Sequence, residues 1–126
     1  MLQRPAESGN AAVLETMLAR GFDPAVPDKD GVTALHRAAM GGFPDAVNVL
    51  LEFGAPVNAK DGMFSAPPIV WAVEGRGHAQ PGADHVGVAR LLINAGSEIE
   101  WTPPPASPGP ERTLEGLRQL RREAAS

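Results

Sequence analysis

The sequence predicts an all-α solenoid, in which short helix-turn-helix units stack side by side. The first observation is a repeat: shifted by 33 positions, the segment Met17–Gly21 (MLARG) falls on Leu50–Gly54 (LLEFG). The second is the number of turn-forming residues, because 14 glycines and 13 prolines separate short apolar stretches. A fixed period of roughly 20 to 50 residues is typical of stacked repeats. A chain of 126 residues also has the length of one domain.

Five consecutive segments follow from this period. They are a partial first unit, a complete second unit, a third unit with an insertion, a proline-rich connector and a capping helix, at residues 1–27, 28–60, 61–101, 102–110 and 111–126. In the third unit, Pro68–Ala72 lies 34 positions after its counterpart, whereas Leu92–Gly96 lies 42 positions after its own. The difference of eight residues is an insertion between Gly75 and His85.

The complete unit predicts a turn followed by two short helices. Asp28–Gly31 (DKDG) has the composition of a tight turn. Thr33 is expected to cap a first helix of small residues that ends at Gly41-Gly42. A second helix is expected from Pro44, which suits a first turn, to Gly54, which stops it.

The second helix of each unit carries the same apolar stripe. The three sets, at i, i+3 and i+4, are Leu14, Met17 and Leu18; Val47, Leu50 and Leu51; Ala89, Leu92 and Ile93. A single helix pair cannot bury such a stripe, so the units are expected to share one core.

Residues 28–60 resemble an ankyrin repeat. Asp30–Ala39 (DGVTALHRAA) matches the opening of that family, with Ala34 in place of the usual proline, and Val49–Ala55 (VLLEFGA) matches its close. The resemblance extends over about residues 2–101. It implies a stack of helix pairs joined by turn fingers, which binds other proteins without catalysing a reaction.

The other two copies depart from the pattern. The first lacks the opening turn and has Pro5 where an alanine is expected, so its first helix should be short or irregular. The third has Val70 in place of His36 and Pro67-Pro68 in place of Thr33-Ala34.

The proline-rich stretch 102–110 predicts a stiff connector, and the residues after it an amphipathic helix. Leu114, Leu117 and Leu120 form one narrow apolar stripe among charged residues. We favour a C-terminal cap over a protruding helix that binds a partner, because an exposed leucine stripe promotes association.

Composition argues against several classes of protein. A net charge of -4 and a pI near 5.3 weaken the case for nucleic acid or anionic membrane as a partner. The absence of cysteine excludes disulfides and thiolate chemistry, and no apolar run reaches the roughly 18 residues of a membrane helix. We therefore expect a cytoplasmic protein. Nine arginines against two lysines, with abundant Ala, Gly and Pro, hint at a bacterial source.

Catalytic and metal-binding patterns are sparse, so no enzyme, cofactor or metal is predicted. The family resemblance gives His36 a structural role near the helix start and the turn, and His85 a similar one. The best candidate metal cluster is His78 with Asp84 and His85 nearby. Its signal is weak, because the spacing of these residues is not regular enough to give a firm third ligand.

The concave face of the stack is the predicted binding site for a partner protein. Its candidate residues come from the first helices (Arg4, Arg37, Met40, Trp71 and Glu74) and from the turns (Lys29, Val32, Met63 and Phe64). Trp, Arg and Met are enriched at interfaces. Two alternatives stay open: Trp71 could instead form local core under the inserted loop of residues 76–84, and that loop could carry specificity or be neutral variation.

The predicted function is a protein-protein interaction module, as an inhibitor, regulator or scaffold. One alternative is a fragment of a longer ankyrin protein, and another is a small-ligand or metal protein that uses the inserted loop. A monomer is favoured, with association through a bare N-terminal face as the other possibility.

Overall fold

The computed structural model describes residues 2–76, 82–97, 101 and 110–125. Within these residues the chain is helical and forms no strand. The helices are α1 (Gln3–Glu7), α2 (Ala11–Ala19), α3 (Ala34–Gly41), α4 (Pro44–Glu52), α5 (Pro68–Arg76), α6 (His85–Asn94) and α7 (Pro110–Ala125). The predicted all-α repeat solenoid is confirmed.

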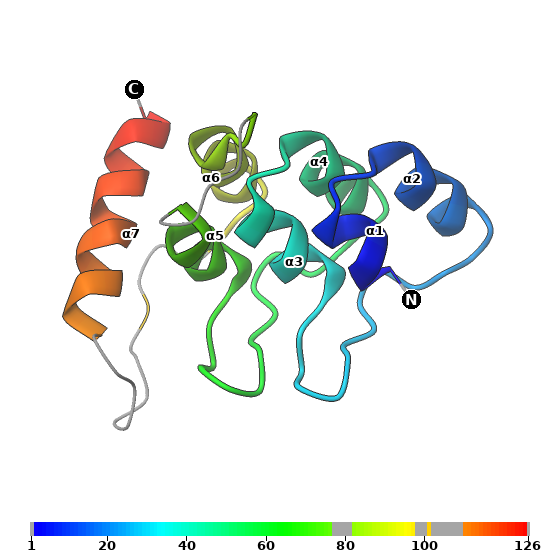
Figure 1. Ribbon diagram of the computed structural model, residues 1–126, viewed down its shortest axis with the longest axis horizontal. Helices are drawn as coiled ribbons and strands as arrows, with labels where there is room; N and C mark the ends of the chain where they lie inside the picture. Colours follow the sequence, from blue (N-terminus) through cyan, green and yellow to red (C-terminus); the bar gives the residue numbers. More distant parts are fainter. Residues whose placement is uncertain (1, 77–81, 98–100, 102–109, 126) are drawn as a thin grey trace.

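The first six helices form two rows (Figure 1). The first helices of the units, α1, α3 and α5, lie side by side in one row, and the second helices, α2, α4 and α6, lie in the other. Two turn fingers, residues 28–32 and 61–66, project on the same side as the first row. The backbone amide of Gly62 donates to the carbonyl of Asp30 at 2.8 Å, so the two fingers are joined to each other.

The helix starts follow the capping residues in the sequence. The hydroxyl of Thr33 accepts the backbone N–H of His36, while the His36 ring accepts the N–H of Thr33, so α3 begins with a capping box. It ends at Gly42, whose φ of 72° is in the left-handed region that favours glycine. The side chains of Asn10 and Asp84 accept the backbone N–H groups of Val13 and Gly87 and so cap the starts of α2 and α6. These bounds confirm the predicted helices.

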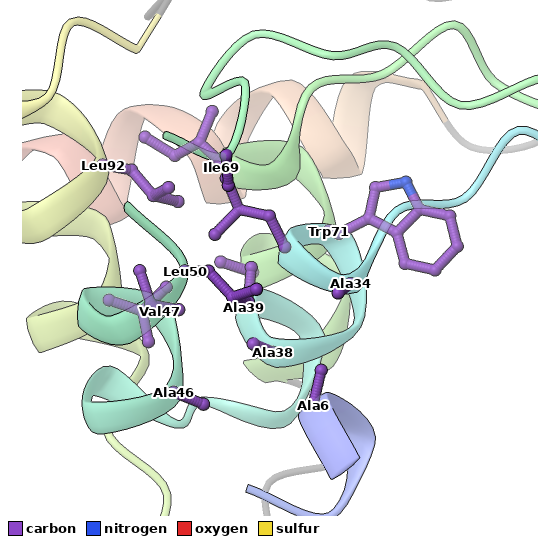
Figure 2. Packing of buried hydrophobic residues seen from close by; sticks show 14 of the residues in the cluster. Ala6, Ala34, Ala38, Ala39, Ala46, Val47, Leu50, Ile69, Trp71 and Leu92 are labelled. Atoms are coloured by element: carbon purple, nitrogen blue, oxygen red, sulfur yellow. The ribbon is translucent and has the colours of Figure 1, made fainter. Parts of the chain in front are cut away.

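The core lies between the two rows and consists of small and branched aliphatic side chains (Figure 2). Leu50, Ile69 and Leu92 have no exposed surface and come from three successive helices. Alanines such as Ala38 and Ala39 let the helices approach closely. One close approach is at Gly75, where a Cβ atom would lie 1.8 Å from the carbonyl oxygen of Met40. Glycine is therefore required there.

The two ends of the stack differ. At the N-terminal end, α1 has only five residues and contains Pro5, as the sequence predicts. At the opposite end, α7 packs against α5 and α6 and buries Leu117 and Leu120, with 3% and 0% exposed surface. The predicted connector lies outside the described residues except for Pro110, as do residues 77–81 of the inserted loop.

Candidate functional site

An apolar hollow of about 430 Å³ opens where α3, α5, finger 61–66 and α7 meet. Ten residues line it, and their side chains are mostly apolar: Arg37, Met40, Met63, Phe64, Ala66, Val70, Trp71, Glu74, Trp101 and Thr113. The hollow lies on the side of the stack formed by the first helices, where the repeat pattern predicts the binding site.

The finger at the edge of the hollow is held by one carboxylate, Asp61. Its Oδ2 accepts the backbone N–H groups of Met63 and Phe64 at 2.8 Å, and its Oδ1 accepts that of Ala66 at 2.9 Å. Burial alone would raise the pKa of Asp61, but these backbone hydrogen bonds and that of the Trp71 indole outweigh it and lower the pKa. The finger is therefore rigid, with Met63 and Phe64 at its tip.

Trp71 forms a wall of the hollow rather than an exposed anchor. Only 8% of its surface is exposed. Its Nε1 donates to Oδ1 of Asp61 at 3.2 Å, and its ring lies 5.3 Å from the His36 ring and 5.6 Å below the Arg37 guanidinium. In Figure 2 the indole points away from Leu50, Ile69 and Leu92. Trp71 thus belongs to the junction between α3, α5 and the finger.

His36 ties α3 to the same finger. Its Nε2–H donates to the carbonyl of Ala66 at 2.9 Å, and its Nδ1 accepts the N–H of Thr33 at 3.1 Å. Both nitrogens are used by one neutral tautomer. Burial lowers the pKa of His36, and the hydrogen bond to Ala66 only partly opposes this effect. The predicted structural role of this histidine is confirmed.

Two polar side chains border the apolar lining. Arg37 lies 3.6 Å from Oδ2 of Asp28, and Oδ1 of the same carboxylate accepts the backbone N–H groups of Asp30 and Val32. Glu74 accepts a hydrogen bond from the hydroxyl of Thr113 on α7. The cap therefore contributes directly to the hollow.

Six of the nine residues predicted from the sequence come together in the hollow, namely Arg37, Met40, Met63, Phe64, Trp71 and Glu74. Val32 has no exposed surface, so its expected place on the binding surface is corrected: it packs in the core at the base of the first finger. Arg4 and Lys29 are exposed but are not part of the lining.

Sequence reasoning missed Trp101 and Thr113. Trp101 donates from its indole nitrogen to the carbonyl of Ser65 at 3.3 Å, which places it beside the finger. An aromatic residue at the end of the third unit, shortly before the expected capping helix, was the available signal. The repeat register did not point to either residue: Trp101 is the last residue of the third unit, and Thr113 lies in the helix that follows.

The candidate metal ligands have other roles or lie outside the described residues. The ring Nε2 of His85 donates to the carbonyl of Met40 at 2.9 Å, which links α6 to α3 and confirms the predicted structural role. Asp84 caps α6, and His78 is outside the described residues. Within the described part of the chain, no group of three metal-binding side chains comes together.

Comparison with known proteins agrees with this geometry. The family model described as "Ankyrin repeats (3 copies)" matches residues 2–102. The chain belongs to the ankyrin-repeat family. Ankyrin repeats are generally non-enzymatic modules for protein-protein interaction. The resemblance, drawn mainly from residues 28–60 and expected over about residues 2–101, is confirmed.

Among relatives, the chain is 32% identical over 95 residues to palmitoyltransferase Hip14 of Drosophila melanogaster, covering 75% of the chain and 14% of that protein. It is 43% identical over 100 residues to the putative ankyrin repeat protein FPV014 of fowlpox virus, covering 79% of the chain and 21% of that protein. The chain spans only a small part of each of these ankyrin-containing relatives. Within the described residues, no helix is both long and apolar enough to cross a membrane.

Proposed function

We propose that this ankyrin-repeat chain binds a partner protein by accepting an apolar side chain of the partner in the hollow. The observation that carries the proposal is the gathering of exposed apolar side chains around it: Met40, Met63 and Phe64 have 38%, 52% and 41% of their surface exposed. Single exposed residues of this kind are common, but a contiguous patch of them is typical of an interaction surface.

The hollow is also rigid before any partner arrives. Asp61 fixes the finger, and Trp71 and His36 connect it to α5 and α3. A preformed site loses little conformational entropy on binding, which favours affinity. Methionine adapts its shape to different side chains, so Met40 and Met63 suit a hydrophobic anchor.

Arg37 supplies polarity at the edge of this apolar surface. Among the described residues, its Nε is buried without an acceptor. A buried donor without a partner is destabilising, so an oxygen of the partner that reached this nitrogen would gain a hydrogen bond. Arg37 is therefore proposed to orient the segment whose side chain enters the hollow.

We also propose that the chain acts as an inhibitor, a regulator or a scaffold. This proposal is supported by the same binding surface around the hollow. The bacterial source and cytoplasmic location stay predictions from composition. Arg4 and Lys29 are proposed to contact only a partner large enough to extend beyond the hollow.

The test compares two phenylalanines of nearly equal exposure. Phe64 lines the hollow and is 41% exposed, whereas Phe53 follows α4 and is 40% exposed outside it. Partners are captured from the native source with the unmodified chain, and binding of each is then measured with Phe64→Ala and Phe53→Ala. A true partner should lose about 2 kcal/mol of binding free energy with Phe64→Ala and almost none with Phe53→Ala. Equal binding by both variants contradicts the proposal.

A further inference from the structure

A second, smaller hollow adjoins the first on the same side of the stack. Its volume is about 230 Å³, and its lining comes from α1, α3 and α5: Glu7, Arg37, Met40, Gly41 and Gly75. Arg37 and Met40 line both hollows. Together the two hollows therefore form a groove across the row of first helices, with α7 and finger 61–66 at one end and α1 at the other.

The exposed side chains along this groove occupy one position of the repeat. Glu7, Met40 and Glu74 follow one another at offsets of 33 and 34 residues, one on each first helix. All three are exposed, even Met40, whose helix α3 packs between α1 and α5. The exposure of Glu7 is therefore a property of this position in the repeat, and it does not arise from the place of α1 at the end of the stack.

Glu7 gives the α1 end of the groove a negative charge. Within the described residues, its carboxylate takes part in no ion pair or hydrogen bond, although Arg4 lies three positions earlier on the same helix. The cation in the lining of the second hollow, Arg37, lies 3.6 Å from the carboxylate of Asp28, which balances its charge. A positively charged side chain that reached the α1 end could therefore pair with Glu7.

Arg37 favours a ligand in an extended conformation between the two ends. Its Nε is a buried donor without an acceptor among the described residues. The carbonyl groups within a helix are already bonded inside that helix, whereas an extended segment presents its carbonyl groups to its surroundings. A main-chain oxygen of an extended segment is thus a suitable acceptor for this nitrogen.

The packing of the helices sets the distance that such a segment must cover. Packed helices lie about 8 to 10 Å apart, so α1 and α5, with α3 between them, are roughly 16 to 20 Å apart. An extended chain advances about 3.3 Å per residue and covers that distance in about five or six residues.

We infer that the partner binds through an extended basic segment, in which a lysine or arginine lies about five or six residues from the apolar side chain. The apolar side chain enters the first hollow, the main chain passes Arg37, and the basic side chain pairs with Glu7. The inference rests on the proposed function, which supplies the apolar side chain, and adds the charge and conformation of the segment. The net charge of -4 also favours a basic segment over an acidic one.

The test is a selection from a phage-displayed library of random peptides of about 12 residues, twice the expected span. Peptides that bind the unmodified chain should share a large apolar residue with Lys or Arg about five or six positions to one side. Selection with Glu7→Lys should replace that basic residue by Asp or Glu. The matched control is Glu15→Lys, at an exposed glutamate on α2 outside the groove, which should select the same peptides as the unmodified chain.

Calorimetric titration of one selected peptide measures the ion pair itself. Glu7→Gln should weaken binding about threefold, the size expected for an exposed ion pair, and less at high salt. A peptide with glutamine in place of its basic residue should bind about threefold more weakly and should not respond to Glu7→Gln, because the pair is then already lost. Circular dichroism melts check that each variant keeps its fold.

Two kinds of failure are distinguishable. Peptides that need Phe64 but show no preference for a basic residue, or keep that preference with Glu7→Lys, overturn the inference and leave the proposed function intact. A selection that yields no peptide, or only peptides unaffected by Phe64→Ala, overturns both.

Discussion

The indole nitrogen of Trp71 donates a 3.2 Å hydrogen bond to Asp61, the same carboxylate that holds three backbone amides of finger 61–66. One buried side chain thus joins α5 to the finger. The wall of the hollow and its edge consequently form a single rigid unit, which links the stability of this region to the shape of the proposed binding site.

Asp61→Asn should destabilise the fold by about 2 to 4 kcal/mol, because the amide group of asparagine would face N–H donors that now share two oxygens. Chemical denaturation measures the free energy of unfolding. The control is Asp30→Asn in the first finger, where the side chain is exposed and a change within about 0.5 kcal/mol is expected. Equal effects of the two substitutions would contradict the role assigned to Asp61.

Trp71→Ala should lower the free energy of unfolding by about 3 to 5 kcal/mol, the usual cost of removing a buried aromatic side chain. The sequence alone gave equal weight to two roles for Trp71: direct contact with a partner, and local core under the inserted loop. With 8% of its surface exposed, Trp71 should act on binding mainly by shaping the hollow. Urea titrations of the unmodified chain and of the Trp71→Ala variant check the prediction. A variant that loses partner binding but keeps its stability would refute it.

Stability should fall as the solution is acidified below pH about 6.5. Burial lowers the pKa of His36 in the folded state, so below its ordinary pKa the unfolded chain takes up a proton that the folded chain does not. This contribution is complete above pH about 6.5 and is lost toward the lower folded-state pKa, by at most about 1.4 kcal/mol per pH unit. NMR titration of the His36 ring checks it directly. A midpoint at or above pH 6.5 would show the opposite sign.

The lowered pKa of Asp61 acts in the same direction at lower pH. Its contribution is present above the ordinary aspartate pKa of about 3.9 and disappears as pH falls through the lower folded-state value. Two successive losses of stability are therefore expected on acidification.

Leu120→Ala should destabilise the chain by about 2 to 5 kcal/mol, because Leu120 is fully buried where α7 covers the last repeat. Leu114→Ala, at a half-buried position of the same helix, should cost less. Thermal melts followed by circular dichroism provide the comparison. If neither substitution alters the melt, α7 does not stabilise the repeats.

Much of the fold could be predicted because its determinants are local. Thr33 and Gly42 mark the ends of α3, and the stripe around Leu50 gives the face that is buried. Even the third repeat, with Pro67-Pro68 in place of the usual cap, starts its helix at Pro68, because proline is tolerated in a first helical turn.

The hollow could be predicted only in part, because its depth depends on contacts between distant segments. The bond from Trp101 to Ser65 and the bond from Thr113 to Glu74 join residues 36 and 39 positions apart. The burial of Val32 was missed because its place in a turn suggested exposure, whereas its side chain fills the base of the finger. Neither these long-range hydrogen bonds nor the burial of Val32 can be predicted from the period of the sequence.

The close approach of Gly75 to the carbonyl of Met40 has a practical consequence for redesign. Since main chain meets main chain at this point, the distance between α3 and α5 does not depend on the size of neighbouring side chains. The side chains of Met40 and Phe64 can therefore be randomised in a combinatorial library while the scaffold keeps its frame. Such a library would retarget recognition to new ligands, provided that Gly75 and Asp61 are held constant.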